Sequence, residues 1–373
     1  MAASVPSWLD RCLDIRDRMV ASATFRRLAT EFPLTRPIAR RRARALFDVC
    51  AGFVYSQVLA AGVRLRLFDI LAEGPQTASA LAERMQLSRE GVGRLLAASA
   101  SLRLVVRRGD AYALGPLGAP LVGNEALVAL IEHHALLYED LRDPVGLLRG
   151  KRDGTALSAY WRYADGAQPA TARPDEVAEY TTLMSASQPL VAAEILDAFG
   201  MGAHRCLLDV GGGEGAFLAA AAARAPHLKL LLFDLPAVAA RARARLAAAG
   251  LGERAAVTGG DFRKDELPRG ADVISLVRVV HDHDDATVRD LLRSTRRALP
   301  PEGVLLLAEP MAGTPGAEPM GDAYFGFYLL AMGRGRPRTR DELRTLLRES
   351  GFRRVEWVPT RMPLQCGLIV ARS

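Results

Sequence analysis

The chain has 373 residues, of which 50% are hydrophobic and 24% are charged. This balance excludes an intrinsically disordered chain, and the length is sufficient for two domains with cores of ordinary size. The apolar runs near residues 217–223 and 304–308 are far shorter than the roughly 18 residues that a membrane span requires. Because the N-terminus also lacks the apolar core of a secretory signal, we expect a cytoplasmic protein.

The positive charge is concentrated near the N-terminus. The net charge is +7, and residues 1–45 hold ten arginines against four acidic side chains. Such a segment would be attracted to an anionic membrane surface, although a solvated helix face has the same composition. We predict a basic N-terminal arm over residues 1–45 that serves either a peripheral membrane contact or simple solvation.

The four cysteines, Cys12, Cys50, Cys206 and Cys366, are widely scattered. No two of them have the spacing of a metal site or of a redox pair. We therefore expect reduced, mostly buried thiols and no bound metal.

Residues 46–125 are predicted to form a winged-helix domain. Helical periodicity, two serine or threonine N-caps and a Gly-Asp turn between two apolar runs indicate three helices followed by a hairpin. The expected elements are, in chain order, a helix over 60–73, helices over 78–85 and 89–101 that begin after Thr77 and Ser88, and strands over 104–106 and 111–114.

A winged helix raises the question of DNA binding. A recognition helix needs side chains that reach base edges and phosphates. The helix over residues 89–101 carries Arg89 and Arg94, but its other side chains are mostly small or apolar. We therefore predict no nucleic-acid partner.

Residues 126–200 are predicted to be a mainly helical linker that contributes to the substrate pocket. Helices between two domains are a natural place for a ligand pocket, although most aromatic side chains there would be ordinary core. The aromatic and histidine side chains that gather in this segment are His133, His134, Tyr138, Tyr160, Trp161, Tyr163 and Tyr180.

From residue 201 onward, strand-length apolar runs alternate with helical stretches, which indicates a doubly wound parallel sheet. The expected strands are 206–210, 228–233, 255–258, 272–277, 304–308, 353–358 and 365–371, and the expected helices are 216–225, 237–249, 286–299 and 340–350. We predict an α/β fold class, with a Rossmann-like sheet of seven strands over residues 201–373 and an N-terminal α-helical winged-helix domain.

A glycine-rich turn, Gly211-Gly212-Gly213-Glu214-Gly215, follows the first of these strands. Ligands of open parallel sheets bind at the carboxyl ends of the strands, and glycine lets the backbone turn sharply and approach a ligand closely. The turn alone also suits a dinucleotide, because Gly211, Gly213 and Ala216 match the G-x-G-x-x-G/A pattern.

Acidic strand ends favour S-adenosylmethionine over a dinucleotide. Asp209, at the end of the first strand, can accept hydrogen bonds from the amino group of a methionine-like moiety but would repel a pyrophosphate. Asp234 ends the second strand and can hold both ribose hydroxyls, a feature that fits either ligand. Asp261 and Phe262 follow the third strand and offer a carboxylate to the adenine amino group and a ring to the base.

The fourth strand runs into a segment rich in histidine and aspartate. His281 lies where this strand leaves the sheet, on the same rim as the donor site. A neutral imidazole there can accept a proton from an acceptor hydroxyl as the hydroxyl attacks the sulfonium methyl group. Glu309, at the end of the fifth strand, can orient this imidazole. We predict His281 as the general base and Glu309 as its supporting acid.

Together these motifs resemble the S-adenosylmethionine-dependent small-molecule O-methyltransferases of plants and bacteria. The resemblance covers roughly residues 46–373 and rests on DVGGGEG, FDLP, GGDF, HDHDD and LLAEP behind a winged-helix domain. It implies a homodimer, formed through the winged-helix domain, which also helps to close the partner's pocket. It further implies that the donor is held by Asp209, Gly211, Gly213, Asp234, Leu235, Asp261, Phe262 and Arg278.

One segment departs from the relatives that methylate phenols. Those relatives often carry a second acid just before an Arg-Thr pair, where this chain has Pro337. With the aromatic run before it, the segment resembles the carotenoid methyltransferases of purple bacteria, which methylate the tertiary hydroxyl of hydroxyneurosporene and demethylspheroidene. This resemblance implies an apolar channel, although ordinary helix core has the same composition. The predicted lining residues are Tyr324, Phe325, Phe327, Tyr328 and Met332.

The favoured function is methyl transfer from S-adenosylmethionine to the tertiary hydroxyl of an acyclic hydroxycarotenoid, in spheroidene-type carotenoid biosynthesis. Such an alcohol is much less acidic than a phenol, so the base must take the proton during transfer, with donor and acceptor held in line. Two other acceptors stay open, a phenolic polyketide and a tetrapyrrole of chlorophyll biosynthesis. From a different class, a non-catalytic winged-helix regulator that senses the donor also fits.

Overall fold

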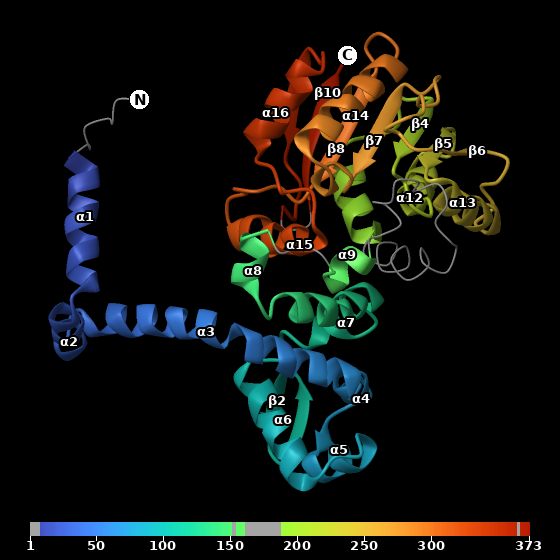
Figure 1. Cartoon of the computed structure of the whole chain (residues 1–373). Helices are drawn as coiled ribbons and strands as arrows, with labels where there is room; N and C mark the ends of the chain where they lie inside the picture. The colour runs from blue at the N-terminus through green and yellow to red at the C-terminus, as the bar shows by residue number, and fades with distance from the viewer. Residues whose placement is uncertain (1–7, 151–153, 161–187, 364–365) are drawn as a thin grey trace. The chain divides into compact units, whose positions relative to one another are not determined.

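The computed structural model describes residues 8–150, 154–160, 188–363 and 366–373. The chain divides into two compact units, Met1–Gly123 and Asn124–Ser373. The first consists of helices with a small sheet, and the second is built around a larger sheet (Figure 1).

The first unit begins with three helices: α1 (Trp8–Ala21), α2 (Ala23–Glu31) and α3 (Arg36–Arg64). The basic N-terminal segment is thus helical where it is described. The Ser22 hydroxyl caps α2, and Pro37 occupies the first turn of α3, where its missing N–H costs nothing. No residue of α1 or α2 is buried. These helices therefore present side chains on all faces.

Helix α3 corrects our expectation that no segment is long enough for a membrane span. By length and composition alone it could cross one, and 17% of its apolar window is buried. Ser56 and Gln57 interrupt the apolar residues of this helix. An unbroken apolar run therefore underestimates the length of this helix.

The rest of the first unit has the order of a winged helix. The predicted helix over 60–73 is in fact two helices, because Arg66 adopts a left-handed conformation with φ of 55° between α3 and α4. The predicted caps are confirmed, since the Thr77 and Ser88 hydroxyls accept hydrogen bonds from Ala80 and Gly91. The elements are α4 (Leu67–Ala72), β1 (Gln76–Thr77), α5 (Ala78–Arg84), α6 (Arg89–Ser101), β2 (Val105–Arg108), β3 (Ala111–Leu114) and a 3-10 turn (Ala119–Leu121), with sheet order β1-β3-β2.

The second unit begins with α7 (Glu125–Asp140), α8 (Pro144–Leu148) and α9 (Ala156–Tyr160), and residues 188–198 are also helical. Asp140 ties two of these helices together, because its carboxylate accepts hydrogen bonds from the first two backbone N–H groups of α9. Trp161, Tyr163 and Tyr180, which we had singled out in the linker, lie outside the described residues.

A seven-stranded sheet forms the core of the second unit and confirms the predicted α/β fold class. Its strands lie in the order β6-β5-β4-β7-β8-β10-β9, parallel except for β10, which is antiparallel to both of its neighbours. The strands are β4 (Cys206–Val210), β5 (Lys229–Asp234), β6 (Ala255–Gly259), β7 (Val273–Val277), β8 (Val304–Glu309), β9 (Arg354–Val358) and β10 (Gly367–Arg372). The helices between them are α12 (Ala216–Arg224), α13 (Pro236–Ala248), α14 (Asp285–Ala298), α15 (Phe325–Met332) and α16 (Arg340–Glu349).

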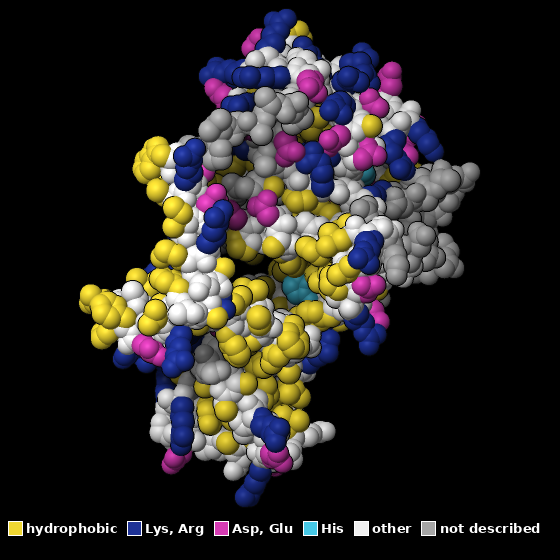
Figure 2. All heavy atoms as spheres, turned by 60° about the vertical axis from the view of Figure 1, so that its left-hand side comes forward, with side chains coloured by type: hydrophobic (Ala, Val, Ile, Leu, Met, Phe, Trp, Pro, Cys, Tyr) yellow, Lys and Arg dark blue, Asp and Glu magenta, His cyan; other side chains and the backbone are white. Residues whose placement is uncertain are grey.

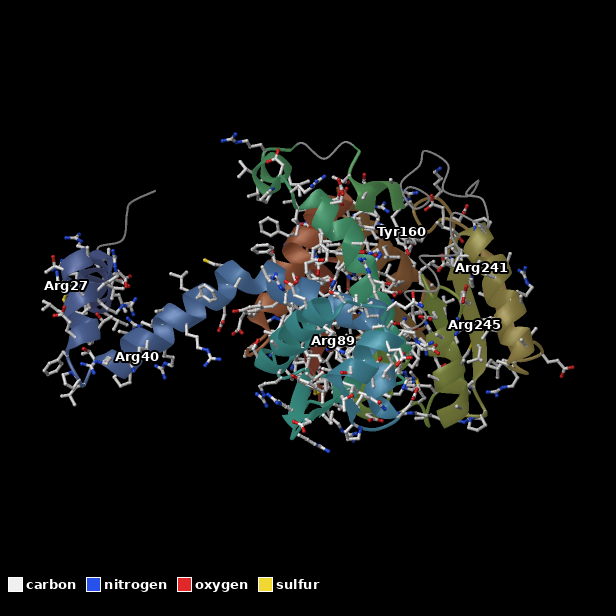
Figure 3. All side chains as sticks on the ribbon, turned by 90° about the horizontal axis from the view of Figure 1, so that it is seen from below. Arg27, Arg40, Arg89, Tyr160, Arg241 and Arg245 are labelled. Carbon is white, nitrogen blue, oxygen red and sulfur yellow. The ribbon has the colours of Figure 1, made fainter. Side chains whose placement is uncertain are left out.

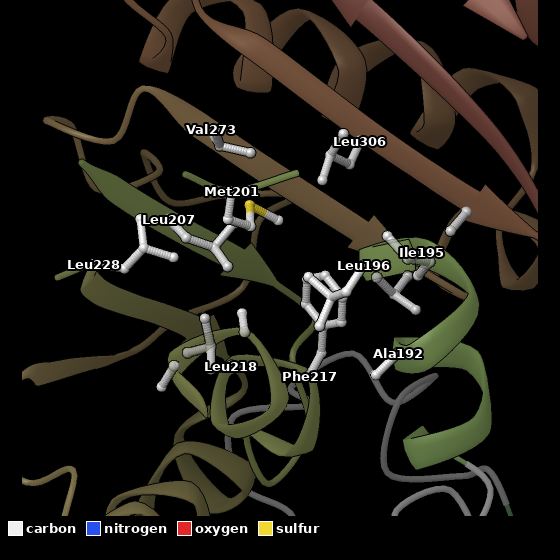
Figure 4. Close-up of a cluster of buried hydrophobic side chains, with 14 of the residues drawn as sticks. Ala192, Ile195, Leu196, Met201, Leu207, Phe217, Leu218, Leu228, Val273 and Leu306 are labelled. Atoms are coloured by element: carbon white, nitrogen blue, oxygen red, sulfur yellow. The ribbon is translucent and has the colours of Figure 1, made fainter. Parts of the chain in front are cut away.

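Hydrophobic cores lie on both faces of this sheet. Successive strand residues point to opposite faces, so Leu207 joins one buried cluster and Leu208 the other. Figure 4 shows the first cluster, in which Phe217 of α12 packs near Ile195 and Leu196. Because both faces are covered, the central strands are apolar throughout and polar side chains occur mainly at their ends.

The cysteines differ partly from expectation. Cys206 and Cys366 are buried, as predicted, but Cys12 and Cys50 are exposed. The reason is that α1 and the first half of α3 bury no side chain. All four thiols are free.

Candidate active site

The glycine-rich turn joins β4 to α12 at the carboxyl edge of the sheet. Gly211 and Gly213 have φ angles of +68° and +57°, which favour glycine. A Cβ atom on Gly211 would lie 2.7 Å from a Val279 methyl carbon, whereas one on Gly213 would meet nothing within 4 Å. The turn therefore needs glycine for its shape and leaves open space at Gly213.

Glu214 of this turn is held by two arginines of α13. Its carboxylate accepts hydrogen bonds from Arg241 and Arg245, which lie on the same helix (Figure 3). These bonds hold the pKa of Glu214 below its ordinary value, although burial acts in the opposite direction. Glu214 thus anchors the turn and is not available to a ligand.

Asp209 is buried beneath the turn with one oxygen unmatched. Its Oδ1 accepts a hydrogen bond of 2.6 Å from the Ser275 hydroxyl, while its Oδ2 has no hydrogen-bond partner among the described residues. Burial raises the pKa of Asp209 to about 7. Leaving a buried carboxylate oxygen unmatched is costly unless a ligand supplies a donor. The amino group of a methionine-like moiety would supply one.

Asp234, at the end of β5, faces the same turn. Its Oδ2 accepts a hydrogen bond of 2.8 Å from Gly213 N, and its Oδ1 accepts one of 2.7 Å from Leu235 N. Burial raises the pKa of Asp234 to about 6. Leu235 precedes α13 and contributes its backbone to this arrangement.

The third predicted contact point follows β6. The Asp261 carboxylate accepts hydrogen bonds from the guanidinium and backbone N–H of Arg263. These bonds hold the pKa of Asp261 below its ordinary value despite burial, so Asp261 is ionised but already has a partner. The Phe262 ring meets the His283 ring edge-on at 5.2 Å. We did not anticipate either of these neighbours, because each depends on the path of a loop.

The structure brings His281 and Glu309 together. The Nδ1 atom of His281 donates a hydrogen bond to Glu309 Oε2, while Glu309 Oε1 accepts hydrogen bonds of 3.0 Å from Val279 N and 2.6 Å from Val280 N. Because a carboxylate only accepts hydrogen bonds, this contact places the proton on Nδ1. The lone pair of neutral His281 is then on Nε2.

Asp282 is a site residue that our sequence reasoning quoted within a motif but did not single out. Its Oδ1 lies 3.1 Å from His281 Nε2 as an ion-pair contact, and it makes no hydrogen bond within the described part of the chain. Burial alone would lower the pKa of His281, but Asp282 and Glu309 together raise it above the ordinary value. The two carboxylates therefore stabilise the protonated imidazole.

Arg338, which the sequence also did not reveal, holds the segment around His281 in place. This guanidinium is 2% exposed and donates hydrogen bonds of 2.8 Å to Val280 O and 2.7 Å to His283 O. It also forms an ion pair with Asp285. In the sequence, only Pro337 draws attention to this loop, and it gives no sign that Arg338 has a partner 58 residues away.

Arg278 directly follows β7 and adopts a left-handed conformation with φ of 56°, which is uncommon for a residue other than glycine. Its positive charge lowers the pKa of both His281 and Asp282, as a minor contribution in each case, so Arg278 lies on their side of the sheet edge. Strained backbone of this kind occurs at functional sites.

The predicted lining residues divide into two groups. Phe325 is half-buried, and its ring lies 5.8 Å from the His281 ring at 66°. Tyr324 and Phe327 are also half-buried. Tyr328 and Met332 belong instead to a buried cluster formed by α7, α8, α9 and α15. The described residues contain no group of three or more His, Cys, Asp or Glu side chains that could hold a metal ion.

The fold and these side chains define a class of protein. A glycine turn flanked by the buried Asp209 and the half-buried Asp234, beside a paired imidazole at the same sheet edge, suits an enzyme that binds S-adenosylmethionine and transfers its methyl group. The comparisons with known proteins agree. Residues 138–353 match the model of an O-methyltransferase domain, and residues 47–124 match that of an O-methyltransferase dimerisation domain.

The chain belongs to this O-methyltransferase family. It is 44% identical to the demethylspheroidene O-methyltransferase of Cereibacter sphaeroides, over 95% of this chain and 93% of that protein. It is 39% identical to the protein of the same name from Rhodobacter capsulatus, over 95% of this chain and 88% of that one. The structure of human N-acetylserotonin methyltransferase in complex with SAM matches with a TM-score of 0.73 and 26% identity, over 89% of this chain and 97% of that one.

Three conclusions follow from this membership. The protein is an S-adenosylmethionine-dependent O-methyltransferase with a small-molecule acceptor. Its dimerisation domain indicates a homodimer. The regulator hypothesis is therefore not needed to explain the winged helix.

Proposed function

We propose that this enzyme methylates the tertiary hydroxyl of an acyclic hydroxycarotenoid of the demethylspheroidene type. The observation that carries the proposal is the 44% identity to a demethylspheroidene O-methyltransferase along nearly the whole of both chains. The half-buried aromatic residues around Phe325, next to His281, suit an acceptor that is apolar close to its reacting hydroxyl.

The donor is held by the glycine turn and the acids around it. Bound S-adenosylmethionine supplies an electrophilic methyl group on a sulfonium centre. Asp209 binds the ammonium group through its unmatched Oδ2, and Asp234 holds the ribose hydroxyls. Gly213 leaves room for the ligand to approach the backbone. Asp261, Phe262, Leu235 and Arg278 complete the contacts around the nucleoside and the sheet edge.

His281 takes the acceptor proton. As the acceptor oxygen bonds to the methyl carbon and the carbon–sulfur bond breaks, the hydroxyl proton moves to Nε2 of His281. Nε2 of the neutral ring can accept this proton because it carries the lone pair and makes no hydrogen bond with Asp282 Oδ1, which lies 3.1 Å away and pairs with the ring once it is protonated. Glu309 holds the ring in place through Nδ1 and stabilises the cation that forms. A tertiary alcohol needs such concerted removal because it does not ionise beforehand.

The test of this function uses the full-length enzyme, methyl-labelled S-adenosylmethionine and demethylspheroidene, with a simple phenol as the competing acceptor. We expect label in the carotenoid and little in the phenol. His281→Ala should lower turnover at least about 100-fold while leaving calorimetric binding of S-adenosylhomocysteine within about twofold. Label in the phenol alone would refute the carotenoid assignment.

The proposal includes a location, cytoplasmic with a peripheral membrane contact through the N-terminal helices. Large apolar side chains are exposed there, among them Trp8 at 76% and Leu34 at 78%. Arg27 lies on α2 and Arg40 on α3 (Figure 3), in the same N-terminal segment, and Figure 2 shows hydrophobic and basic side chains together at the surface of the molecule. A lipid-soluble acceptor would be reached at an anionic membrane surface.

Vesicle binding tests this contact. The triple variant Arg40→Gln, Arg41→Gln, Arg42→Gln should sediment less with phosphatidylglycerol vesicles than the unmodified enzyme. The matched control, Arg89→Gln, Arg94→Gln, Arg107→Gln, removes the same charge from exposed positions of the winged helix. Equal binding by both triple variants would refute a contact specific to the N-terminal helices.

A further inference from the structure

Two adjacent histidines of α7 are bonded to two tyrosines near the start of α15. His133 Nε2 lies 2.8 Å from the Tyr328 hydroxyl, and His134 Nε2 lies 2.8 Å from the Tyr324 hydroxyl. Tyr324 and Tyr328 are four residues apart, so they share one helix face, and their rings stack at 5.9 Å. Two hydrogen bonds therefore connect adjacent residues of α7 to one turn at the start of α15.

These polar groups lie beside an apolar cluster. Leu137, Leu157 and Met332 are among its buried members. Burial lowers the pKa of His133 to about 4, lowers the pKa of His134 and raises the pKa of Tyr324. His133, His134 and Tyr324 are thus neutral at neutral pH, and one hydrogen bond joins each histidine to its tyrosine. Apolar side chains of similar volume would pack as well there, so stability alone does not require these pairs.

What these hydrogen bonds provide is a defined position for each tyrosine ring. A phenol ring packed only by apolar neighbours can shift along its contacts, whereas one with a hydrogen bond on its hydroxyl has a defined position. The segment that is fixed in this way includes the π-helical turn Pro319–Tyr324, which ends where α15 begins. Such turns are rare and occur frequently at functional sites.

The fixed segment leads directly to the candidate base. The Phe325 ring meets Tyr324 edge-on at 5.1 Å and Tyr328 at 6.5 Å, and it lies 5.8 Å from His281. A chain of contacts therefore runs from His134 through Tyr324 and Phe325 to His281. A displacement of Tyr324 would move the apolar wall beside the imidazole.

We propose that His133 and His134 are acceptor-positioning residues, which set the selectivity for long apolar acceptors by fixing Tyr328 and Tyr324 and, through them, the Phe325 ring beside His281. The inference rests on the proposed function of this site. Neither histidine touches the reacting atoms in this account. Their effect is on where the carbon next to the acceptor hydroxyl lies when His281 takes the proton.

The test compares variants of one pair. Tyr324→Phe and His134→Leu each break the hydrogen bond, and His134→Gln retains a side-chain donor near the position of Nε2. The control is Thr345→Val, which removes an exposed hydroxyl that donates to Asp341 O within α16. The readouts are kcat and KM for demethylspheroidene and for a short tertiary alcohol with the same reacting end, together with the calorimetric Kd for S-adenosylhomocysteine.

We expect Tyr324→Phe and His134→Leu to lower kcat/KM for the long acceptor about tenfold and to reduce its preference over the short alcohol. The donor Kd should stay within twofold, and His134→Gln should recover most of the loss. The proposal would be overturned if the preference for the long acceptor over the short alcohol were unchanged, even with a lower Tm. It would also be overturned if the donor Kd and the acceptor kcat/KM worsened to the same extent.

A failure of the proposed function is distinguishable from a failure of this inference. If the unmodified enzyme methylates phenols and no carotenoid, the carotenoid assignment is wrong, and the same preference is then measured between a large and a small phenol. The double variant His134→Leu, Tyr324→Phe replaces the pair by two apolar groups. The double variant should recover the Tm lost in the single variants but not the acceptor preference. Recovery of both the Tm and the preference would show that the pair has only a structural role.

Discussion

The Nε2 atom of His281 lies 3.1 Å from a carboxylate oxygen of Asp282, its neighbour in the chain. With Glu309 on Nδ1, the imidazole is enclosed by two negative charges, which raise the pKa of His281 against the effect of burial. Only the neutral ring accepts a proton, so the acceptor reaction requires a pH above this raised pKa.

The first prediction concerns the pH dependence of catalysis. For the unmodified enzyme kcat/KM should rise with pH and level off above an inflection that is higher than 6.5. Asp282→Asn removes one of the two charges and should lower the inflection by about one unit. Asp284→Asn, which alters the N-cap of α14, is the control and should leave the inflection in place. An inflection that is the same in all three enzymes would contradict the role of Asp282.

The second prediction concerns donor affinity. An ionised Asp209 attracts the donor's ammonium group, and a protonated one does not. Because the pKa of Asp209 is raised to about 7, affinity should weaken below that pH, by up to roughly tenfold per unit. Asp234, with a pKa of about 6, adds a second loss at lower pH. Calorimetry with S-adenosylhomocysteine from pH 5 to 8 measures this.

Asp209→Asn is the matched variant for that experiment. It keeps the shape of the side chain but cannot ionise, so its affinity should be weaker at pH 8 and should change less with pH. Affinity of the unmodified enzyme that does not vary with pH would show that Asp209 is not part of the donor site.

The third prediction uses two glycines of one loop. Gly335 has φ of +74°, and a Cβ atom on it would lie 2.2 Å from His281 O. Gly333 has φ of +93°, but a Cβ atom there meets nothing within 4 Å. Gly333→Ala should therefore cost only the backbone strain, about 1–2 kcal/mol. Gly335→Ala should cost about 1–3 kcal/mol more and should also reduce kcat, because it displaces the backbone of His281. Equal stability and kcat for the two variants, from urea unfolding and turnover, would contradict the close contact.

The fourth prediction concerns Arg338. Arg338→Met leaves two backbone carbonyls without their donor and Asp285 with Arg336 as its remaining partner, and should lower the free energy of unfolding by about 3–5 kcal/mol. The control Arg293→Met breaks an exposed pair with Asp290 and should cost less than about 1 kcal/mol. If the two losses were similar, Arg338 would not hold the His281 segment as described.

Much of the fold could be predicted because its causes are local. The hydroxyls of Thr77 and Ser88 cap their helices through bonds to residues three positions on. The strand-length apolar runs became strands, since both faces of a parallel sheet are buried. The break at Arg66 could not be predicted, because the apolar periodicity continues across it.

The candidate site also contains residues that could be predicted from the sequence and residues that could not. Asp209, Asp234 and Glu309 were identifiable because each ends a strand, and strand ends of a parallel sheet meet along one edge. Asp282 was overlooked because its importance depends on how a short turn directs it toward the ring of its neighbour. Arg338 depends on a loop that returns to the sheet edge from far along the chain.

Sequence by itself determined the alternation of strands and helices, the glycine turn and the row of acids at the strand ends, because periodicity and spacing act within a few residues. Only the tertiary structure decided that two carboxylates enclose His281 and that His133 and His134 reach Tyr328 and Tyr324. The paired residues lie 195 and 190 positions apart. A hydrogen bond depends on distance and angle in space, which packing establishes after the local elements have formed.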